Sequence, residues 1–284
     1  MSGPPRTGWP ILSRSERVGC RALRRASVFA VAVAFLLSSP KEICRRRPPR
    51  IAFPERTRGS YALLMHQLDT TRIIGTLARL KAVGSAAFGV EAHGFRVNAR
   101  LSEADAWAFE QDHKIVLPAD FRVFLMDVGN GGAGPFYGVF PLGQMDDNVG
   151  LRQWNENDGL VGILSEPFLL EEPWNDLSGI PNSELESQNE AEYWAQMDSF
   201  EKRYWSSILV NGAIPICHEG CALRIWLVVT GRRPGYLWED RRSENEGLLP
   251  VRLANGSPAT FGSWYEQWLD DCVATVNGKQ LSNP

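Results

Sequence analysis

The sequence predicts an α+β fold, a single domain in which a mainly antiparallel sheet is flanked by helices. Several segments place apolar residues at the three- and four-residue spacing of an amphipathic helix. Two strand-like segments between residues 222 and 240 are separated by a turn at 231–235, which is typical of a hairpin. The predicted helices and strands do not alternate regularly, so a parallel sheet of βαβ units is not expected.

Two helices are predicted at the start of this domain. The first spans residues 69–83, and the second begins at Ser102, where Ser102-x-x-Asp105 approximates a capping box. The first has three apolar residues on one face, and the second is expected to bury two aromatic side chains. These residues are Ile73, Leu77, Leu80, Trp107 and Phe109.

A short helix, a glycine-rich turn and a strand are predicted within residues 117–143, LPADFRVFLMDVGNGGAGPFYGVFPLG. Pro118 suits the first helical position, where no N–H is needed. Gly129 follows the helix where a left-handed cap is expected, and residues 130–134 allow backbone shapes that larger side chains forbid. Residues 137–140 are predicted to form a short buried strand. The apolar stripe of the helix is Phe121, Phe124, Leu125 and Val128.

An acidic loop and helix region is predicted over residues 144–205. Residues 144–182 scatter Gly, Pro, Asn and Asp, and a helix is expected over 183–205, where Ser183-x-x-Glu186 forms a capping box. Its apolar stripe has 4-3-4 spacing and consists of Tyr193, Met197, Phe200 and Tyr204.

Strands and a closing helix complete the predicted domain. Residues 214–216, 222–230 and 236–240 are expected to be strands, and the last two form the hairpin. The closing helix is predicted over 263–276, with Ser263-x-x-Glu266 as its capping box. Its buried stripe consists of Phe261, Trp264, Tyr265, Trp268 and Cys272.

The order of these signals resembles the SUKH superfamily, in the branch of the fungal cell-wall assembly regulators and many bacterial immunity proteins. LPADFRVFL at 117–125, GNGG at 129–132 and YGVFPL at 137–142 match the usual signature of that branch. The HGFR run at 93–96 and the segment 209–230, with its GC turn, resemble flanking segments. The last strand and closing helix contribute Tyr236-Leu-Trp238, Trp264, Tyr265 and Trp268.

The resemblance covers roughly residues 68–273 and implies a SUKH-like domain over 61–284. The resemblance predicts the fold more specifically than the function, because the superfamily is a binding scaffold with many partners. The residues of its structural signature are Leu117, Pro118, Phe121, Leu125, Gly129, Asn130, Gly131, Gly132, Gly220 and Cys221.

The resemblance further implies a protein-binding module and no enzymatic activity. The leading expectation is an immunity protein that neutralises a toxin, often a basic nuclease or deaminase. The alternative is a regulatory adaptor of the cell-wall regulator type. A hydrolase is a third class, but no positioned acid–base motif favours it.

Charge divides the chain into two parts. Residues 1–60 carry 13 Lys/Arg against 3 Asp/Glu, whereas residues 61–284 carry 17 against 30. The acidic part is expected to repel nucleic acid and anionic membranes and to attract a cationic partner, such as a toxin domain. Five cysteines form no disulfide framework, which predicts a cytoplasmic protein.

Residues 1–60 form a basic, Arg- and Pro-rich leader without an amphipathic period. It is expected to be disordered or untranslated, with Met65 as a downstream start. The alternative is export through a secretory signal, because an apolar run at 28–37 follows three arginines. Pro40 and the lack of an A-x-A site argue against that signal.

No cofactor and no metal are expected. The glycine-rich run at 128–135 follows its helix and lacks the Lys-Ser/Thr of a phosphate-binding loop. Cys217-His218-x-x-Cys221 offers three of the four ligands that a structural zinc site uses. We interpret both cysteines as small apolar fillers around a turn at Gly220. No third residue orients His218 as the base for a thiol nucleophile.

Two candidate partner-binding regions follow from the sequence. Residues 153–201 contain 12 Asp/Glu and no Lys or Arg, interleaved with aromatics, which suits either a docking face for a basic partner or an acidic surface whose aromatics pack inward. In the hairpin, alternation places a second aromatic group opposite the core face, either open or covered by a helix. The predicted partner-binding residues are Glu171, Glu172, Trp174, Arg224, Trp226, Tyr236 and Trp238.

Removal of the leader tests the predicted domain boundary. A fragment that starts at Met65 is expected to melt at the same temperature as the full chain, because residues 1–60 lack periodic apolar residues. Thermal melts of both proteins provide the measurement. A large loss of stability in the fragment would show that the leader belongs to the fold.

Overall fold

The structure is a computed structural model that describes residues 68–84, 87–147, 150–156 and 159–281, with side chains described to residue 278. These residues belong to one compact unit, His66–Pro284. The predicted leader lies outside the described residues.

The helices are α2 (Thr70–Val83), α3 (Val90–His93), α4 (Glu103–His113), α5 (Ala119–Val123), α6 (Ser183–Gln188), α7 (Glu190–Tyr204) and α8 (Phe261–Leu281). A π-helix, η1 (Phe124–Val128), and two 3-10 helices, η2 (Ser207–Val210) and η3 (Arg242–Glu244), accompany them.

Two antiparallel sheets complete the unit, so the predicted α+β class is confirmed. The larger sheet has the order β3-β4-β5-β6, and the smaller is the hairpin β1–β2. The pairing of β4 with β5 confirms the predicted hairpin. Strands β1, β2 and β6 were not expected. The strands are β1 (Gln144–Asp147), β2 (Gly150–Gln153), β3 (Ala213–Gly220), β4 (Leu223–Val228), β5 (Leu237–Arg241) and β6 (Gly247–Pro250).

Other segments cover both edges of the larger sheet. Val139 forms isolated bridges to Cys217 on β3 and to Gly132, so the predicted strand at 137–140 is reduced to a bridge. At the opposite edge, Trp174 exchanges two backbone hydrogen bonds with Leu248 of β6, at 2.9 and 2.8 Å. These bonds use part of the edge backbone of β3 and of β6, which leaves less of it for pairing with a further strand.

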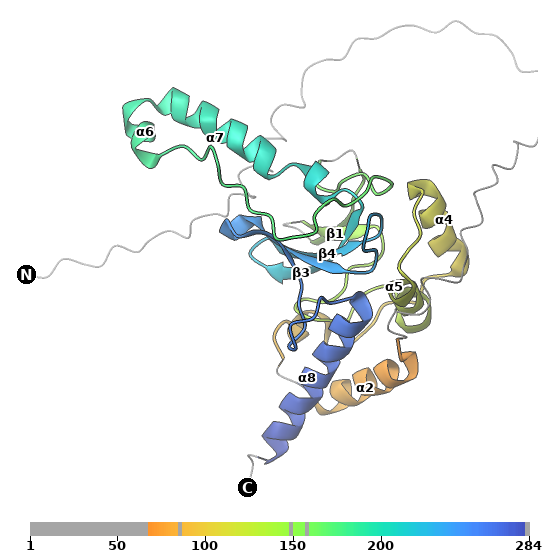
Figure 1. Ribbon diagram of the computed structural model, residues 1–284. Helices are drawn as coiled ribbons and strands as arrows, with labels where there is room; N and C mark the ends of the chain where they lie inside the picture. The colour runs from red at the N-terminus through yellow and green to blue at the C-terminus, as the bar shows by residue number, and fades with distance from the viewer. Residues whose placement is uncertain (1–67, 85–86, 148–149, 157–158, 282–284) are drawn as a thin grey trace, which may run out of the picture. The chain divides into compact units, whose positions relative to one another are not determined.

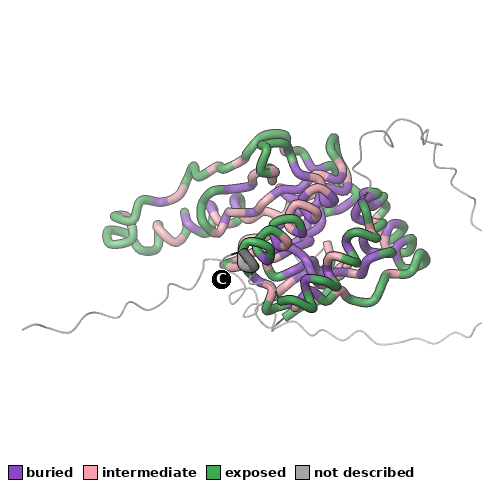
Figure 2. Tube along the Cα trace, turned by 90° about the horizontal axis from the view of Figure 1, so that it is seen from below, coloured by how far each residue is buried: buried purple, intermediate pink, exposed green. Residues whose placement is uncertain are grey.

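Helices α2, α5 and α8 pack together beside the larger sheet (Figure 1). The predicted stripe of α2 is buried, and Asp69 caps this helix by accepting a hydrogen bond from the Arg72 N–H at 2.9 Å. Helix α8 begins earlier than predicted, because Thr260 rather than Ser263 accepts the first side-chain cap bond. Figure 2 shows the buried residues running through the inside of the unit.

Helix α4 differs from its prediction in the face that it buries. Ser102 is the N-cap as expected, but Trp107 is 59 % exposed and Phe109 is only partly buried. The buried face instead carries Ala106 and Glu110. Glu110 is turned inward because its carboxylate accepts a hydrogen bond from the Leu117 N–H at 2.9 Å. A buried polar contact therefore overrides the aromatic pattern.

The segment 117–134 differs from its prediction in two details. Pro118 is the N-cap of α5 rather than its first residue, and the helix widens into η1 before it ends. Gly129 has φ 172°, so it is extended and not left-handed. A Cβ atom there would lie 2.7 Å from the Asn98 carbonyl oxygen, so close packing is what requires glycine. Gly131 and Gly132 do adopt positive φ, at 79° and 99°.

The helix predicted over 183–205 is divided at Asn189. Asn182 caps α6, and Asn189 caps α7 by accepting a hydrogen bond from the Glu192 N–H. An Asn side chain that bonds to the nearby backbone competes with a continuous helix, which explains the break. The predicted capping residue Ser183 is instead the first residue of α6.

Gly132 provides a test of this packing. Gly132→Ala is expected to lower the free energy of unfolding by about 1–3 kcal/mol, because its φ is positive and the new Cβ would meet Arg96 O at 2.6 Å. The matched control is Gly75→Ala in α2, where nothing lies within 4 Å, and this change should stabilise by about 0.5–1 kcal/mol. Denaturant titration measures both. Equal stability of the two variants would contradict the packing argument.

Candidate functional site

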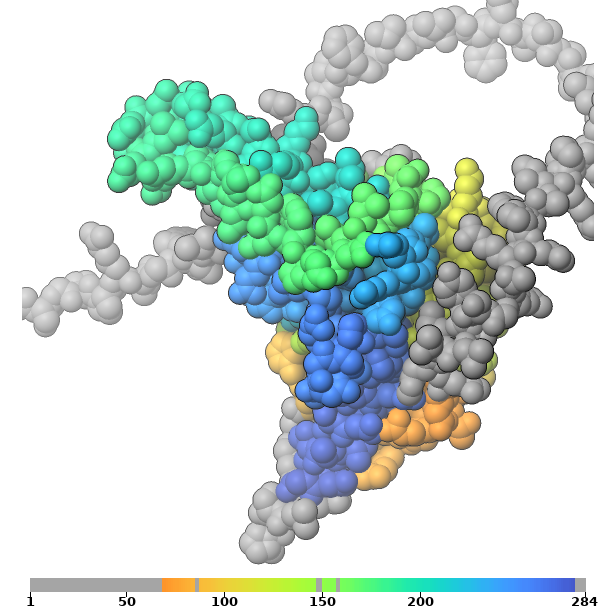
Figure 3. All heavy atoms as spheres, in the orientation of Figure 1, coloured from red at the N-terminus to blue at the C-terminus, as the bar shows by residue number. Residues whose placement is uncertain are grey.

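Helices α6 and α7, residues 183–204, form what we call the acidic arm, which stands out from the rest of the unit in Figure 3. The arm has a small apolar cluster of its own. Three buried side chains of α7, Met197, Phe200 and Tyr204, pack against partly buried aromatic and apolar neighbours. These neighbours are Trp174, Ile180, Tyr193, Trp194 and Trp205.

The charge of the arm is strongly negative. Four exposed glutamates, two in the first turn of each helix, form no ion pair with a basic side chain in the described part of the chain: Glu184, Glu186, Glu190 and Glu192. The basic residues of the arm are Lys202 and Arg203, both in the last turn of α7. An acidic side chain near a helix N-terminus interacts favourably with the helix dipole and stabilises the helix by about 0.3–1 kcal/mol. These glutamates therefore also stabilise the arm itself.

A buried ion pair anchors the arm to the sheet. The Arg242 guanidinium donates to the Asp240 carboxylate at 2.6 Å and to the Tyr204 carbonyl oxygen at 3.1 Å. Asp240 also accepts a hydrogen bond from the indole N–H of Trp226 at 3.3 Å. The same guanidinium lies over the Trp205 ring at 5.1 Å. The base of the arm is therefore fixed by polar contacts that pack inside the protein.

The aromatic residues predicted for the hairpin do not form an open cluster. Trp226 is 2 % exposed and Trp238 is 5 % exposed, so neither ring is available to a partner. Both faces of the larger sheet are covered, which alternation along one strand does not reveal. Trp174 is half-buried against Tyr204, with ring centroids 5.5 Å apart. Arg224 forms a bidentate ion pair with Asp146 of β1, at 3.0 and 3.1 Å.

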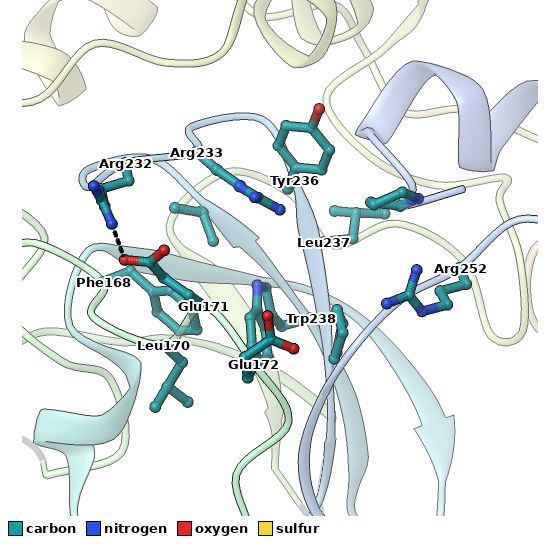
Figure 4. Close-up of a pocket in the computed structure, with 13 residues that line it drawn as sticks. Phe168, Leu170, Glu171, Glu172, Arg232, Arg233, Tyr236, Leu237, Trp238 and Arg252 are labelled. Carbon is teal, nitrogen blue, oxygen red and sulfur yellow. Dashed lines mark hydrogen bonds and ion pairs between the residues drawn. The ribbon is translucent and has the colours of Figure 1, made fainter. Parts of the chain in front are cut away.

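The structure brings four of the predicted residues to one pocket of about 80 Å3: Glu171, Glu172, Tyr236 and Trp238 (Figure 4). Three arginines that the sequence analysis did not select also line it: Arg232, Arg233 and Arg252. Arg232 pairs with Glu171. The adjacent arginines Arg232 and Arg233 in the predicted turn could have been selected from the sequence as candidate binding residues. Arg252 could not, because it follows the unpredicted strand β6.

The turn from β3 to β4 carries the Cys-His-x-x-Cys motif. Cys217 is buried, and desolvation raises the pKa of its thiol well above the ordinary value. Cys221 is exposed at the turn, which corrects its interpretation as an apolar filler. His218 stacks on Tyr137 at 5.5 Å and lies 3.8 Å from Asp146. Gly220 has φ 104°, as a turn requires.

Glu219 lies in a crowded acidic corner beside β5. Burial, together with the nearby Glu239 carboxylate, raises the pKa of its carboxyl group to about 8, although Arg241 opposes the shift. Arg241 is already engaged by three carboxylates, those of Glu239, Glu244 and Glu246. The Oε1 atom of Glu219 is buried without a hydrogen-bond partner. A raised pKa favours the protonated, neutral form of this carboxyl group near pH 7.

Among the described residues, no group of three or more His, Cys, Asp or Glu side chains is arranged to hold a metal ion. Within the same part of the chain, no helix has the length and apolar composition needed to cross a membrane. Comparison with protein-family models, curated proteins and solved structures finds no match to this chain. The geometry of surfaces and pockets therefore carries the functional argument.

Glu219 predicts a pH dependence of stability. Its pKa is about 8 when folded and 4.5 ordinarily, so between these values the folded chain holds a proton that the unfolded chain has lost. The free energy of unfolding should then fall as pH rises through this range. Glu219→Gln is expected to flatten the fall, because Gln stays neutral, whereas the exposed Glu184→Gln should not. Urea titrations from pH 5 to pH 8.5 measure this. An unchanged slope in Glu219→Gln would refute the assignment.

Proposed function

We propose that this domain is a non-enzymatic protein-binding module that acts in the cytoplasm as an immunity protein and neutralises a cationic toxin. The acidic arm is the observation that carries the proposal, because the four exposed glutamates in the first turns of its helices form no ion pair with a basic side chain within the described residues. The resemblance to the SUKH superfamily supports the same role. The three described cysteines are free thiols, which is consistent with a reducing compartment.

Charge on the arm favours rapid association with a basic protein. A surface patch of one sign steers an oppositely charged partner and raises the association rate, and salt weakens this effect. Residues 61–284 carry 30 Asp/Glu against 17 Lys/Arg, so the field of the arm adds to that of the whole domain. A toxin that binds nucleic acid has a basic active-site face, which an acidic protein can occupy in place of the substrate.

Aromatic rings on the arm can hold a partner after encounter. Tyr193 and Trp194 are half-buried and contact each other edge to face, with centroids 5.2 Å apart. Aromatic side chains dominate the affinity of many interfaces and act mainly on the dissociation rate. Their position beside Glu190 and Glu192 combines an aromatic anchor with a charged rim, as protein interfaces do.

A regulatory adaptor is the second candidate function, and a separate aromatic patch favours it. Phe88 is 63 % exposed, and its ring lies 5.5 Å from that of Tyr137 and 6.4 Å from that of Phe136. This patch comes from other segments than the arm. An adaptor that holds two proteins needs two such surfaces, whereas an immunity protein needs one. Simultaneous binding of two partners would favour the adaptor.

Changing Glu184, Glu186, Glu190 and Glu192 together to Gln tests the arm. The partner used in the test is the product of the gene adjacent to the one that encodes this chain. Its association with the variant is expected to be at least severalfold slower at low salt, and the dissociation rate should change less. Binding kinetics at two salt concentrations measure this effect. Co-expression tests whether the native chain protects the cell from that product and whether the variant protects less.

The control removes the same number of negative charges from other surfaces. Four exposed carboxylates outside the arm are changed to amides: Glu91, Asp112, Asp127 and Asp271. If both variants slowed association equally, net charge rather than the arm would govern binding. A salt-independent association rate, or no protection in co-expression, would remove the immunity role and leave the adaptor.

A further inference from the structure

The pocket beside the β4–β5 turn has a charge opposite to that of its surroundings. Of the charged residues that line it, two are glutamates and three are arginines. Glu171 and Arg232 form an ion pair with each other, as the dashed line in Figure 4 marks. The remaining charges are those of Glu172, Arg233 and Arg252, so the pocket is net positive in a domain that is strongly negative.

Unpaired side chains at the rim make this charge available. Arg233 and Glu172 are exposed, and neither side chain forms an ion pair or side-chain hydrogen bond in the described part of the chain. Arg252 donates one N–H to the Gly256 carbonyl oxygen at 2.9 Å, and its other donors have no partner among the residues that the structure describes. In Figure 4 the guanidinium of Arg252 extends toward Trp238 from the side opposite Arg232. Guanidinium groups prefer carboxylate and phosphate oxygens as partners.

The floor of the pocket is apolar. It is formed by the buried residues Phe168, Leu237 and Trp238, with the rings of Phe168 and Trp238 5.0 Å apart. A volume of about 80 Å3 is smaller than the cavity of about 150 Å3 that holds benzene, so the enclosed group has only a few carbon atoms. An apolar floor with a few polar groups at the rim is the usual construction of a small-molecule site.

We propose that this pocket binds a monocarboxylate with a small branched aliphatic group. The aliphatic group lies on the floor, and the carboxylate accepts hydrogen bonds from Arg233 and Arg252. A monoanion suits the net charge of the rim, whereas a doubly charged phosphate would be opposed by Glu172. The carboxylate can come from a free acid or from the C-terminus of a peptide, because the two share this chemistry.

A cation is the less favoured occupant. A lysine side chain could approach Glu172, but the Arg233 and Arg252 guanidinium groups, which form no ion pair within the described residues, would oppose it. The site therefore differs from the acidic arm in the sign of its ligand and in the residues that form it. The two proposals can fail separately, because the arm variants leave every residue of the pocket unchanged.

Titration of the isotopically labelled full chain with 4-methylpentanoate and with N-acetyl-leucine tests the proposal. Both carry a carboxylate and an isobutyl group, and only the second mimics a peptide C-terminus. Saturable NMR shifts are expected at Arg233 and at the Trp238 indole N–H, and N-acetyl-leucine amide should give none. If N-acetyl-leucine binds more tightly than 4-methylpentanoate, the ligand is the C-terminus of a peptide. If it binds equally or more weakly, the ligand is a free acid.

Variants separate the roles of the rim residues. Arg233→Gln and Arg252→Gln are each expected to weaken binding about two- to fivefold, as for exposed ion pairs, and Glu172→Gln should strengthen it by a similar factor. The matched control is Arg100→Gln, because Arg100 is exposed and lies outside the pocket. This variant should bind the ligand as tightly as the native chain does. Amide binding as tight as acid binding, or weaker binding by Glu172→Gln, would overturn the proposal. So would the absence of saturable shifts.

Discussion

The close approach of three backbone segments at the glycine-rich loop is the constraint on which the rest of the domain depends. Gly132 lies between Val97 and Val139 and forms a bridge to each of them. A Cβ atom at Gly132 would lie 2.6 Å from one neighbouring carbonyl oxygen, so no larger residue fits without movement. Ala133 follows, and its carbonyl oxygen accepts a hydrogen bond from the buried Tyr265 hydroxyl at 2.8 Å. Through these contacts the loop joins the sheet edge, the segment before α4 and helix α8.

A second fixed point joins the sheet to the acidic arm. The pair Asp240–Arg242 is buried, and its remaining hydrogen-bonding groups are used by Trp226 and by the Tyr204 carbonyl. Burial of two charges costs free energy that their attraction offsets only when the surrounding polar groups are satisfied, as they are here. The pair therefore gives the arm a defined base. Mobility in the arm would otherwise spread its charge and weaken the steering of a partner.

Opposite charges are gathered at two separate places on the domain. The arm carries four exposed glutamates that form no ion pair within the described residues, and the pocket beside the β4–β5 turn concentrates arginines. Such a division suits a protein that recognises partners by charge and presents little open backbone, because both edges of its larger sheet are covered. The aromatic patch at Phe88 and Tyr137 adds a third type of surface. A binding module can use these surfaces without any catalytic group.

By itself the sequence determined the elements whose signals are local. The stripe of α2, the cap at Ser102 and the β4–β5 hairpin follow from spacing and capping chemistry, which act over a few residues. In the segment 117–134, close packing and not a left-handed cap explains Gly129. Local patterns failed where a partner outside the helix intervened: the Glu110 carboxylate turns inward to accept a hydrogen bond from Leu117, and Trp107 is left exposed.

Only the tertiary structure decided the surfaces. Alternation along β4 places Trp226 opposite the core face, but it cannot show that this face is covered as well. The charge of the pocket likewise arises because Arg252, after an unpredicted strand, lies with Arg233 from a turn about twenty residues earlier. Burial and charge at a surface depend on which segments meet in space, and no spacing within one segment contains that information.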